Sequence, residues 1–151
     1  VGERTGRFEV FEQDLYRILD LEPDNALALN MLGYTLTDQT DRHEEALGLI
    51  RRALALKPDE AAYIDSMGWV QYRLKNFDEA IVHLRRALSM LPNDEVAAHL
   101  GEVLWVTGEK AEAAAVWQQA LEWKPDSSAL KQVMERFING PDQANSSIQT
   151  N

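Results

Sequence analysis

The sequence contains no cysteine. This absence excludes disulfides, thiolate metal sites and a cysteine nucleophile, and it is compatible with either the cytoplasm or the periplasm. Histidine is scarce as well: only His43, His83 and His99 occur, and no two of them have metal-ligand spacing on one helix. The HExxH and GxSxG motifs and a phosphate-binding glycine loop are also missing. We therefore expect no catalytic residue, no metal site and no cofactor in this chain.

Long apolar runs are missing too, since none approaches the ~20 residues that span a bilayer, and no secretory signal precedes Val1. The net charge of −10, with a pI near 4.7, argues against nucleic acid and anionic membrane surfaces as partners. Such acidity fits either an interaction module or a solvated surface that aids solubility. The 151 residues, 45% of them hydrophobic, are enough for one continuous core.

A period of about 34 residues runs through the chain. The pairs Leu32-Gly33, Met67-Gly68 and Leu100-Gly101 recur, with glycines 35 and 33 residues apart (68−33 and 101−68). Each pair is followed by the pattern Ala-x3-large-x2-Ala-x4-Pro, which starts at Ala46, Ala80 and Ala113. The large position holds Ile50, Leu84 and Trp117. A period this regular predicts stacked structural repeats.

These motifs resemble the tetratricopeptide repeat, whose pattern is W-x2-L-G-x2-Y…A-x3-F…P over 34 residues. The first large position is Leu29, Ile64 or Ala97 here, and the tyrosine position is Leu36, Gln71 or Leu104, so each single match is degenerate. The resemblance covers about residues 26–125. It implies an all-α fold, a right-handed α-α superhelical solenoid of tetratricopeptide helix hairpins.

Packing physics explains the small residues of the pattern. A glycine on the first helix lets the second helix approach, with the first alanine facing it, and the second alanine makes room for the next repeat. Proline then stops the second helix. We expect Asp24, Asp59, Asp94 and Asp126 to cap the helices that follow the prolines, and Asp41 to open a second helix with Glu44 as a capping box.

The repeats predict the domain organisation. Residues 1–25 form a partial repeat that has only its second helix, after a frayed lead-in at 1–7, and this suggests an excised piece of a longer protein. Three repeats follow at 26–58, 59–92 and 93–125, then a C-terminal capping helix at 126–138 and a disordered tail at 139–151. We expect Phe8 and Phe11, on the apolar helix from Phe8 to Leu21, to be covered by the lead-in, by a dimer mate or by a neighbouring molecule in a crystal.

In this family the first helix of each repeat lines a concave groove, and the resemblance carries this role to specific positions. Tyr34, Trp69 and Glu102 each follow a repeat glycine, and Tyr72 and Trp105 lie one turn later. Aromatic residues with polar tips anchor partner segments well, although a single Trp can equally pack between repeats. The predicted partner-binding residues are Asn30, Met31, Tyr34, Asp38, Asp65, Trp69, Tyr72, Arg73, His99, Glu102 and Trp105.

The charge of this surface indicates the partner. The family's carboxylate clamp needs lysine and asparagine at groove positions that here hold Asn30/Tyr34 and Asp65/Trp69, so the clamp is absent. Because the remaining charges are mostly acidic, we expect a protein or peptide partner with an apolar or basic segment.

The runs YIDSMGWVQYRL and HLGEVLWVTGEKAEAAAVWQQAL resemble the C-terminal repeats of bacterial cell-envelope tetratricopeptide lipoproteins. Some of these act as adaptors of carboxyl-terminal processing proteases, which implies a scaffold on the periplasmic side of the outer membrane, with the cytoplasm as the alternative. Two further hypotheses stay open. One is self-assembly as a homodimer through Phe8–Leu21, and the other is the regulatory arm of an enzyme whose catalytic domain lies elsewhere.

Overall fold

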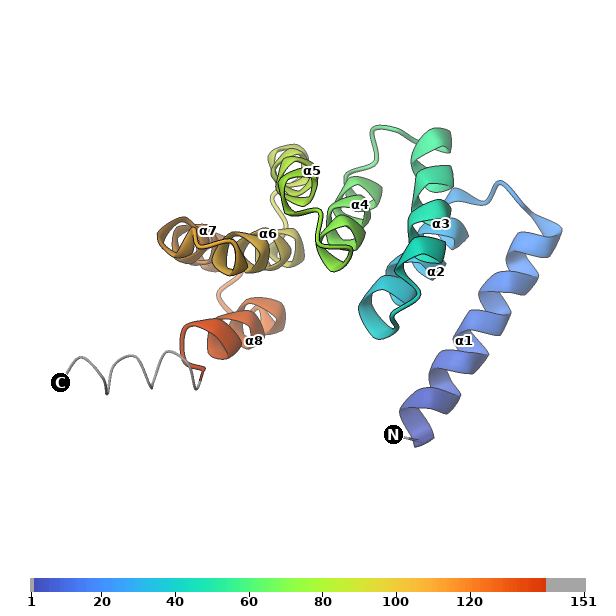
Figure 1. Ribbon diagram of the computed structural model, residues 1–151, viewed down its shortest axis with the longest axis horizontal. Helices are drawn as coiled ribbons and strands as arrows, with labels where there is room; N and C mark the ends of the chain where they lie inside the picture. Colours follow the sequence, from blue (N-terminus) through green and yellow to red (C-terminus); the bar gives the residue numbers. More distant parts are fainter. Residues whose placement is uncertain (1, 141–151) are drawn as a thin grey trace. The chain divides into compact units, whose positions relative to one another are not determined.

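The computed structural model describes residues 2–140, with side chains from Gly6 onward. Eight helices and no strand occupy this part of the chain (Figure 1). The helices are α1 (Gly2–Leu21), α2 (Ala26–Gln39), α3 (His43–Leu56), α4 (Ala61–Arg73), α5 (Phe77–Met90), α6 (Asp94–Val106), α7 (Lys110–Trp123) and α8 (Ser128–Phe137). Each interval predicted to be a repeat therefore contains two helices, and the predicted capping helix corresponds to α8.

The chain forms two compact units, Val1–Ala80 and Ile81–Asn151. In the first unit, α2 packs against α1, α3 and α4, and α3 also packs against α4. In the second unit, α6 packs against α7 and α8, and α7 also contacts α8. Helix hairpins thus bury their apolar faces against each other and against a neighbouring helix, as stacked repeats require.

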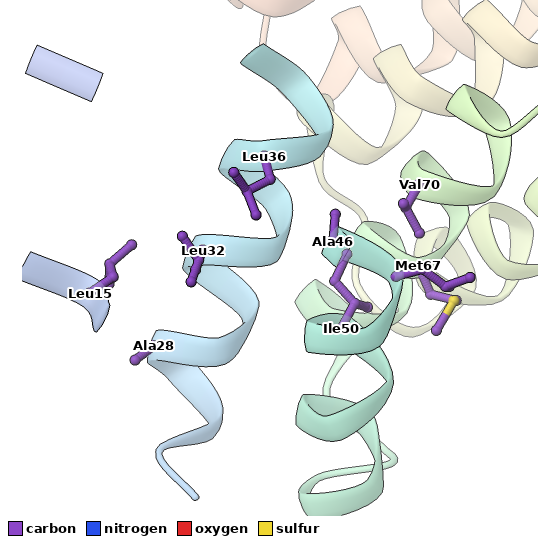
Figure 2. Packing of buried hydrophobic residues seen from close by; sticks show 9 residues of the cluster. Leu15, Ala28, Leu32, Leu36, Ala46, Ile50, Met67 and Val70 are labelled. Atoms are coloured by element: carbon purple, nitrogen blue, oxygen red, sulfur yellow. The ribbon is translucent and has the colours of Figure 1, made fainter. Parts of the chain in front are cut away.

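The core of the first unit joins four helices (Figure 2). Leu15 of α1 reaches the α2 side of this core, and Ile50 of α3 lies near Met67 of α4. The repeated small and large positions of the second helices are all fully buried. They are Ala46, Ile50, Ala53, Ala80, Leu84, Ala87, Ala113, Trp117 and Ala120. The packing role that the spacing predicts for these residues is confirmed.

Two of the repeat glycines face the large residue of their own hairpin. A Cβ at Gly33 would lie 2.6 Å from Cγ1 of Ile50, and one at Gly101 would overlap the indole ring of Trp117. The predicted glycine–alanine contact is only partly right, because Ala46 contributes its carbonyl oxygen and not its methyl group. Glycine is needed here because the large side chain occupies the space that a Cβ would fill.

The predicted aspartate caps are wrong. The N-terminus of α2 is capped by Asn25, whose Oδ1 accepts from Ala28 N at 2.9 Å. In the same way Asn93 caps α6 and Ser127 caps α8. After Pro23, Pro58 and Pro125, the proline and the aspartate together form a turn, so the residue after the aspartate becomes the cap. The capping box at Asp41 is wrong as well, because α3 is capped by Arg42 without a side-chain hydrogen bond.

Both ends of the described chain differ from the sequence prediction. The helix α1 starts at Gly2, so the frayed lead-in predicted for 1–7 is wrong for nearly all of its length. Extending an existing helix costs little per residue, and a glycine costs only ~1 kcal/mol, so Gly2 and Gly6 do not end it. At the other end, Asn139 N donates to Met134 O and Gly140 is buried. The predicted disordered tail is thus wrong for 139–140, and 141–151 lie outside the described residues.

Candidate partner-binding surface

The outward side of α2 carries most of the accessible side chains of the predicted groove. The opposite side of α2 is fixed in the core by Leu29, Leu32 and Leu36, so the orientation of the helix is set. The outward residues, spaced 4, 3 and 4 apart, are Leu27, Met31, Tyr34 and Asp38, and we call them the α2 ridge. Leu27 is 59% exposed and Met31 is 36% exposed, whereas Tyr34 is half-buried and Asp38 is exposed.

Asn30 lies beside the α2 ridge and is half-buried. Its Oδ1 is buried and has no hydrogen-bond partner within residues 6–140. A buried amide oxygen in this state loses its bonds to water without replacement.

The predicted residues of α4 are mostly enclosed. Trp69 is 6% exposed and Asp65 is 8% exposed, whereas Tyr72 and Arg73 are half-buried. The rings of Trp69 and Tyr72 lie 5.0 Å apart between centroids, and Tyr72 also contacts Phe77 at 6.0 Å. The structure therefore places Asp65 and Trp69 within packed surroundings, while their part in binding remains a prediction.

The predicted residues of α6 lie partly under α8. Glu102 is buried, and its Oε1 lies 3.4 Å from Nη1 of Arg136 on α8. The ring of Trp105 stacks on Trp117 with centroids 5.7 Å apart and lies 6.3 Å from Phe137 of α8. Lys110 Nζ is also 5.2 Å from the centre of the Trp105 ring. These contacts give Trp105 a packing role in the second unit.

His99, the remaining predicted residue of α6, is half-buried. The structure thus brings the predicted residues together in two sets. Those of α2 and α4 lie on neighbouring helices of the first unit, and those of α6 belong to the second unit. A groove that is continuous over all three repeats remains a prediction.

A polar cluster that the sequence analysis missed joins α1 to α3. Arg42 Nη1 is 2.7 Å from Glu12 Oε1, Arg42 Nη2 is 2.8 Å from Glu45 Oε2, and the Tyr16 hydroxyl donates to Glu45 Oε1 at 2.7 Å. We call these four residues the α1 clasp. Its contacts between the two helices join residues 26 to 30 positions apart, so no local sequence pattern connects them.

The α1 clasp shifts the ionisation of its members. The hydrogen bond from Tyr16 and that from Arg42 lower the pKa of Glu45. Bonds to Glu12 and Glu45 raise the pKa of Arg42, and burial together with Glu45 raises the pKa of Tyr16. In the second unit, Arg85 Nη1 lies 2.6 Å from Glu112 Oε2 and lowers the pKa of that carboxyl group.

The outward side of α1 carries four exposed apolar residues next to the exposed ion pair of Asp14 and Arg17. The apolar residues, spaced 1, 7 and 3 apart, are Val10, Phe11, Ile18 and Leu21. Phe11 lies 12 residues before Pro23 and Ile18 lies 5 residues before it (23−11 and 23−18). The second helices of the complete repeats have buried alanines at these two distances from their prolines. Phe8, by contrast, packs against the core of the first unit, so the core and not the lead-in covers it.

Within residues 6–140, no group of three or more His, Asp or Glu side chains has the arrangement of a metal site. Among the described helices, none combines the length and the apolar character that a membrane crossing requires.

Comparison with known sequences agrees with the geometry. Two tetratricopeptide repeat profiles match the chain, one at residues 4–61 and the other at residues 72–137. Together with the helix hairpins and their buried small residues, these matches show that the chain belongs to the tetratricopeptide repeat family. The fold is accordingly an all-α helical repeat solenoid.

Among its relatives is the TPR repeat-containing protein PA4667 of Pseudomonas aeruginosa, which is 49% identical over 102 residues. That match covers 68% of this chain but only 17% of the relative. The thermophilic TPR protein TTC0263 of Thermus thermophilus has a similar structure, with a TM-score of 0.76 at 24% identity over 91% of this chain and 74% of that one. MamA has a TM-score of 0.69 at 20% identity, covering 97% of this chain and 86% of its own.

Proposed function

We propose that the chain is a non-catalytic scaffold that binds a partner protein or peptide along the first helices of its repeats. The tetratricopeptide fold supports a protein-interaction role in general. The observation that carries the more specific proposal is the α2 ridge, where Leu27 and Met31 remain exposed beside the unpaired amide oxygen of Asn30. Apolar groups next to an unsatisfied acceptor suit a partner that buries side chains and donates a hydrogen bond.

The mechanism is preorganisation. The core fixes α2 through Leu29, Leu32 and Leu36, so the ridge keeps its position before the partner arrives. The scaffold then loses little conformational freedom on binding, and the entropic cost falls mainly on the partner.

The specific partner that we propose is a carboxyl-terminal processing protease of the bacterial cell envelope, for which the chain would serve as an adaptor. Support comes from the resemblance of residues 63–74 and 99–121 to envelope lipoproteins of this type and from the 49% identity to the Pseudomonas relative. Since the chain spans 17% of that relative, an adaptor role of the whole protein is part of the same proposal.

The test uses accessible residues, because truncating the buried Trp69 would report on folding. We expect the double variant Met31→Asp, Tyr34→Ala to keep its helical circular dichroism and to lose binding to a purified processing protease by at least about tenfold, as for a central contact pair. Leu56→Asp is the matched control, since Leu56 is 43% exposed and lies on α3, which carries no residue of the ridge. Equal affinity of the double variant and the control would reject the α2 ridge as the binding surface.

A second candidate function is self-association through α1, which its uncovered residues Val10, Phe11, Ile18 and Leu21 support. Burying these side chains between two copies would remove apolar area from water and favour a dimer. Light scattering over a hundredfold concentration range tests this. Phe11→Asp should reduce the measured mass if a dimer forms, and a monomer at all concentrations would reject the candidate.

A further inference from the structure

The α2 ridge has the geometry of a seam between two helices. Leu27, Met31, Tyr34 and Asp38 follow the 4-3-4 spacing by which one helix presents side chains to another. From Leu27 to Asp38 there are 11 steps (38−27), so the ridge is ~16 Å long, about three helical turns. An extended strand repeats its side chains every ~6.6 Å on one face, whereas the ridge repeats about every 5–6 Å, as a partner helix does.

The charge at the end of the ridge selects among partner helices. Asp38 lies in the last turn of α2, where the helix dipole is negative and where no basic residue is present. Within the described part of the chain, no ion pair joins Asp38 to a cation. A carboxylate at this place opposes the dipole and weakens the fold. A cation brought by a partner would remove this repulsion at the moment of binding.

We propose that the α2 ridge docks an amphipathic helix of about three turns with a lysine or arginine at one end, and that Asp38 determines this charge preference. This inference rests on the proposed scaffold function and names the class of partner for the same surface. In the bound state, apolar partner residues at 3–4 spacing cover Leu27, Met31 and Tyr34, and the partner cation lies beside Asp38. The α2 helix itself contains no basic residue, so an acidic partner gains no compensating contact along it.

The experiment uses three fluorescein-labelled synthetic peptides of equal length. The first is an amphipathic helix with leucines at 3–4 spacing and two lysines at one end, the second replaces the lysines by glutamates, and the third carries a central proline that breaks the helix. Fluorescence polarisation measures their affinities for the whole chain at low and high salt. We expect the lysine peptide to bind at least ~5-fold more tightly than the glutamate peptide, as for a close surface charge pair, and the proline peptide to bind weakly.

Asp38→Asn separates the role of the charge from that of the ridge. It should reduce the lysine preference to less than about twofold and raise the thermal midpoint, because the unfavourable carboxylate is gone. The exposed control Asp41→Asn, outside any helix, should leave the preference unchanged. A preference that survives in Asp38→Asn, a fall in its thermal midpoint, tight binding of the proline peptide, or failure of all three peptides to bind would each overturn the inference.

The outcome also distinguishes this inference from the scaffold function. If Met31→Asp weakens the lysine and glutamate peptides equally while Asp38→Asn changes nothing, the ridge binds partners but the charge preference is wrong. If Met31→Asp leaves both peptide binding and protease binding unchanged, the scaffold function on this ridge is wrong as well.

Discussion

Replacing Gly101 by alanine tests whether the fold depends on a small residue where the two helices of a hairpin meet. The added Cβ would lie 2.6 Å from Cδ1 of Trp117 and closer still to Nε1 and Cε2. Trp117 is fully buried and has little space in which to move. Its ring contacts those of Trp105 and Phe137, with centroids 5.7 and 6.2 Å away, and its Nε1 donates to Ala98 O.

The expected loss follows from two opposing effects. Alanine in place of glycine inside a helix favours folding by ~1 kcal/mol. Overpacking a rigid site costs ~1–3 kcal/mol and sometimes more, and displacing Trp117 also disturbs two ring contacts. We therefore expect a net destabilisation of roughly 2 kcal/mol, which lowers the melting temperature by about 4–8 °C in a chain of this size.

Two other glycines provide matched controls for the same chemical change. Gly48 is exposed on α3, and no atom lies within 4 Å of the position that its added methyl group would take, so Gly48→Ala should raise the melting temperature by ~2–4 °C. Gly33 faces Ile50 Cγ1 at 2.6 Å, so Gly33→Ala should fall between the two. Circular dichroism, followed during heating and during urea titration, measures all three variants. The reasoning is refuted if Gly101→Ala is as stable as Gly48→Ala.

Three further predictions concern the turns, the α1 clasp and the cap of α8. Lys75 has a φ of 69°, and Gly108, at the equivalent position of the third repeat, has a φ of 98°. In urea titrations, Lys75→Gly should be neutral or stabilise the fold by up to ~1 kcal/mol, and Gly108→Ala should destabilise it by ~1 kcal/mol. The pKa of Glu45 is lowered in the fold, so its contribution is complete above its ordinary pKa of 4.5 and is lost as the pH falls through the lower folded value. The protection factors of the α1 amides in hydrogen exchange should therefore fall below about pH 4.5, and Glu45→Gln should remove that fall. An unchanged pH profile of the protection factors in this variant would contradict the role of the clasp. Ser127→Ala removes the bonds of the Ser127 hydroxyl to Leu130 N and Asp94, and it should cost ~1–2 kcal/mol in thermal unfolding, whereas Ser128→Ala, at an exposed neighbour, should cost little.

The packing slots of this fold could be predicted because they depend on spacing along one chain. Ala80, Leu84 and Ala87 have counterparts in every complete repeat at fixed distances from a proline, and each is fully buried. A residue that touches the adjacent helix of its own hairpin is constrained by local geometry. The period therefore contains the information that defines these contacts.

The accessibility of the binding residues could not be predicted in the same way. Glu102 belongs to the outward face of α6 by its position, yet Arg136 of α8, 34 residues later, lies against it. Asp65 and Trp69 are likewise buried, although their positions in the repeat predict accessible side chains. The caps failed for a different reason. Whether Asp24 or Asn25 caps α2 depends on the turn at Pro23, which shifts the start of the helix by one residue.

The α1 clasp has a consequence for how the protein fails under stress. The Glu12–Arg42 ion pair and the hydrogen bond from Tyr16 to Glu45 join α1 to the start of α3, and salt screens such contacts far more than it weakens apolar ones. Concentrated salt should therefore loosen this end of the molecule first. When α1 detaches, Leu15 and Phe8 become accessible in addition to the outward Ile18. Aggregation between molecules would then begin at this exposed apolar helix.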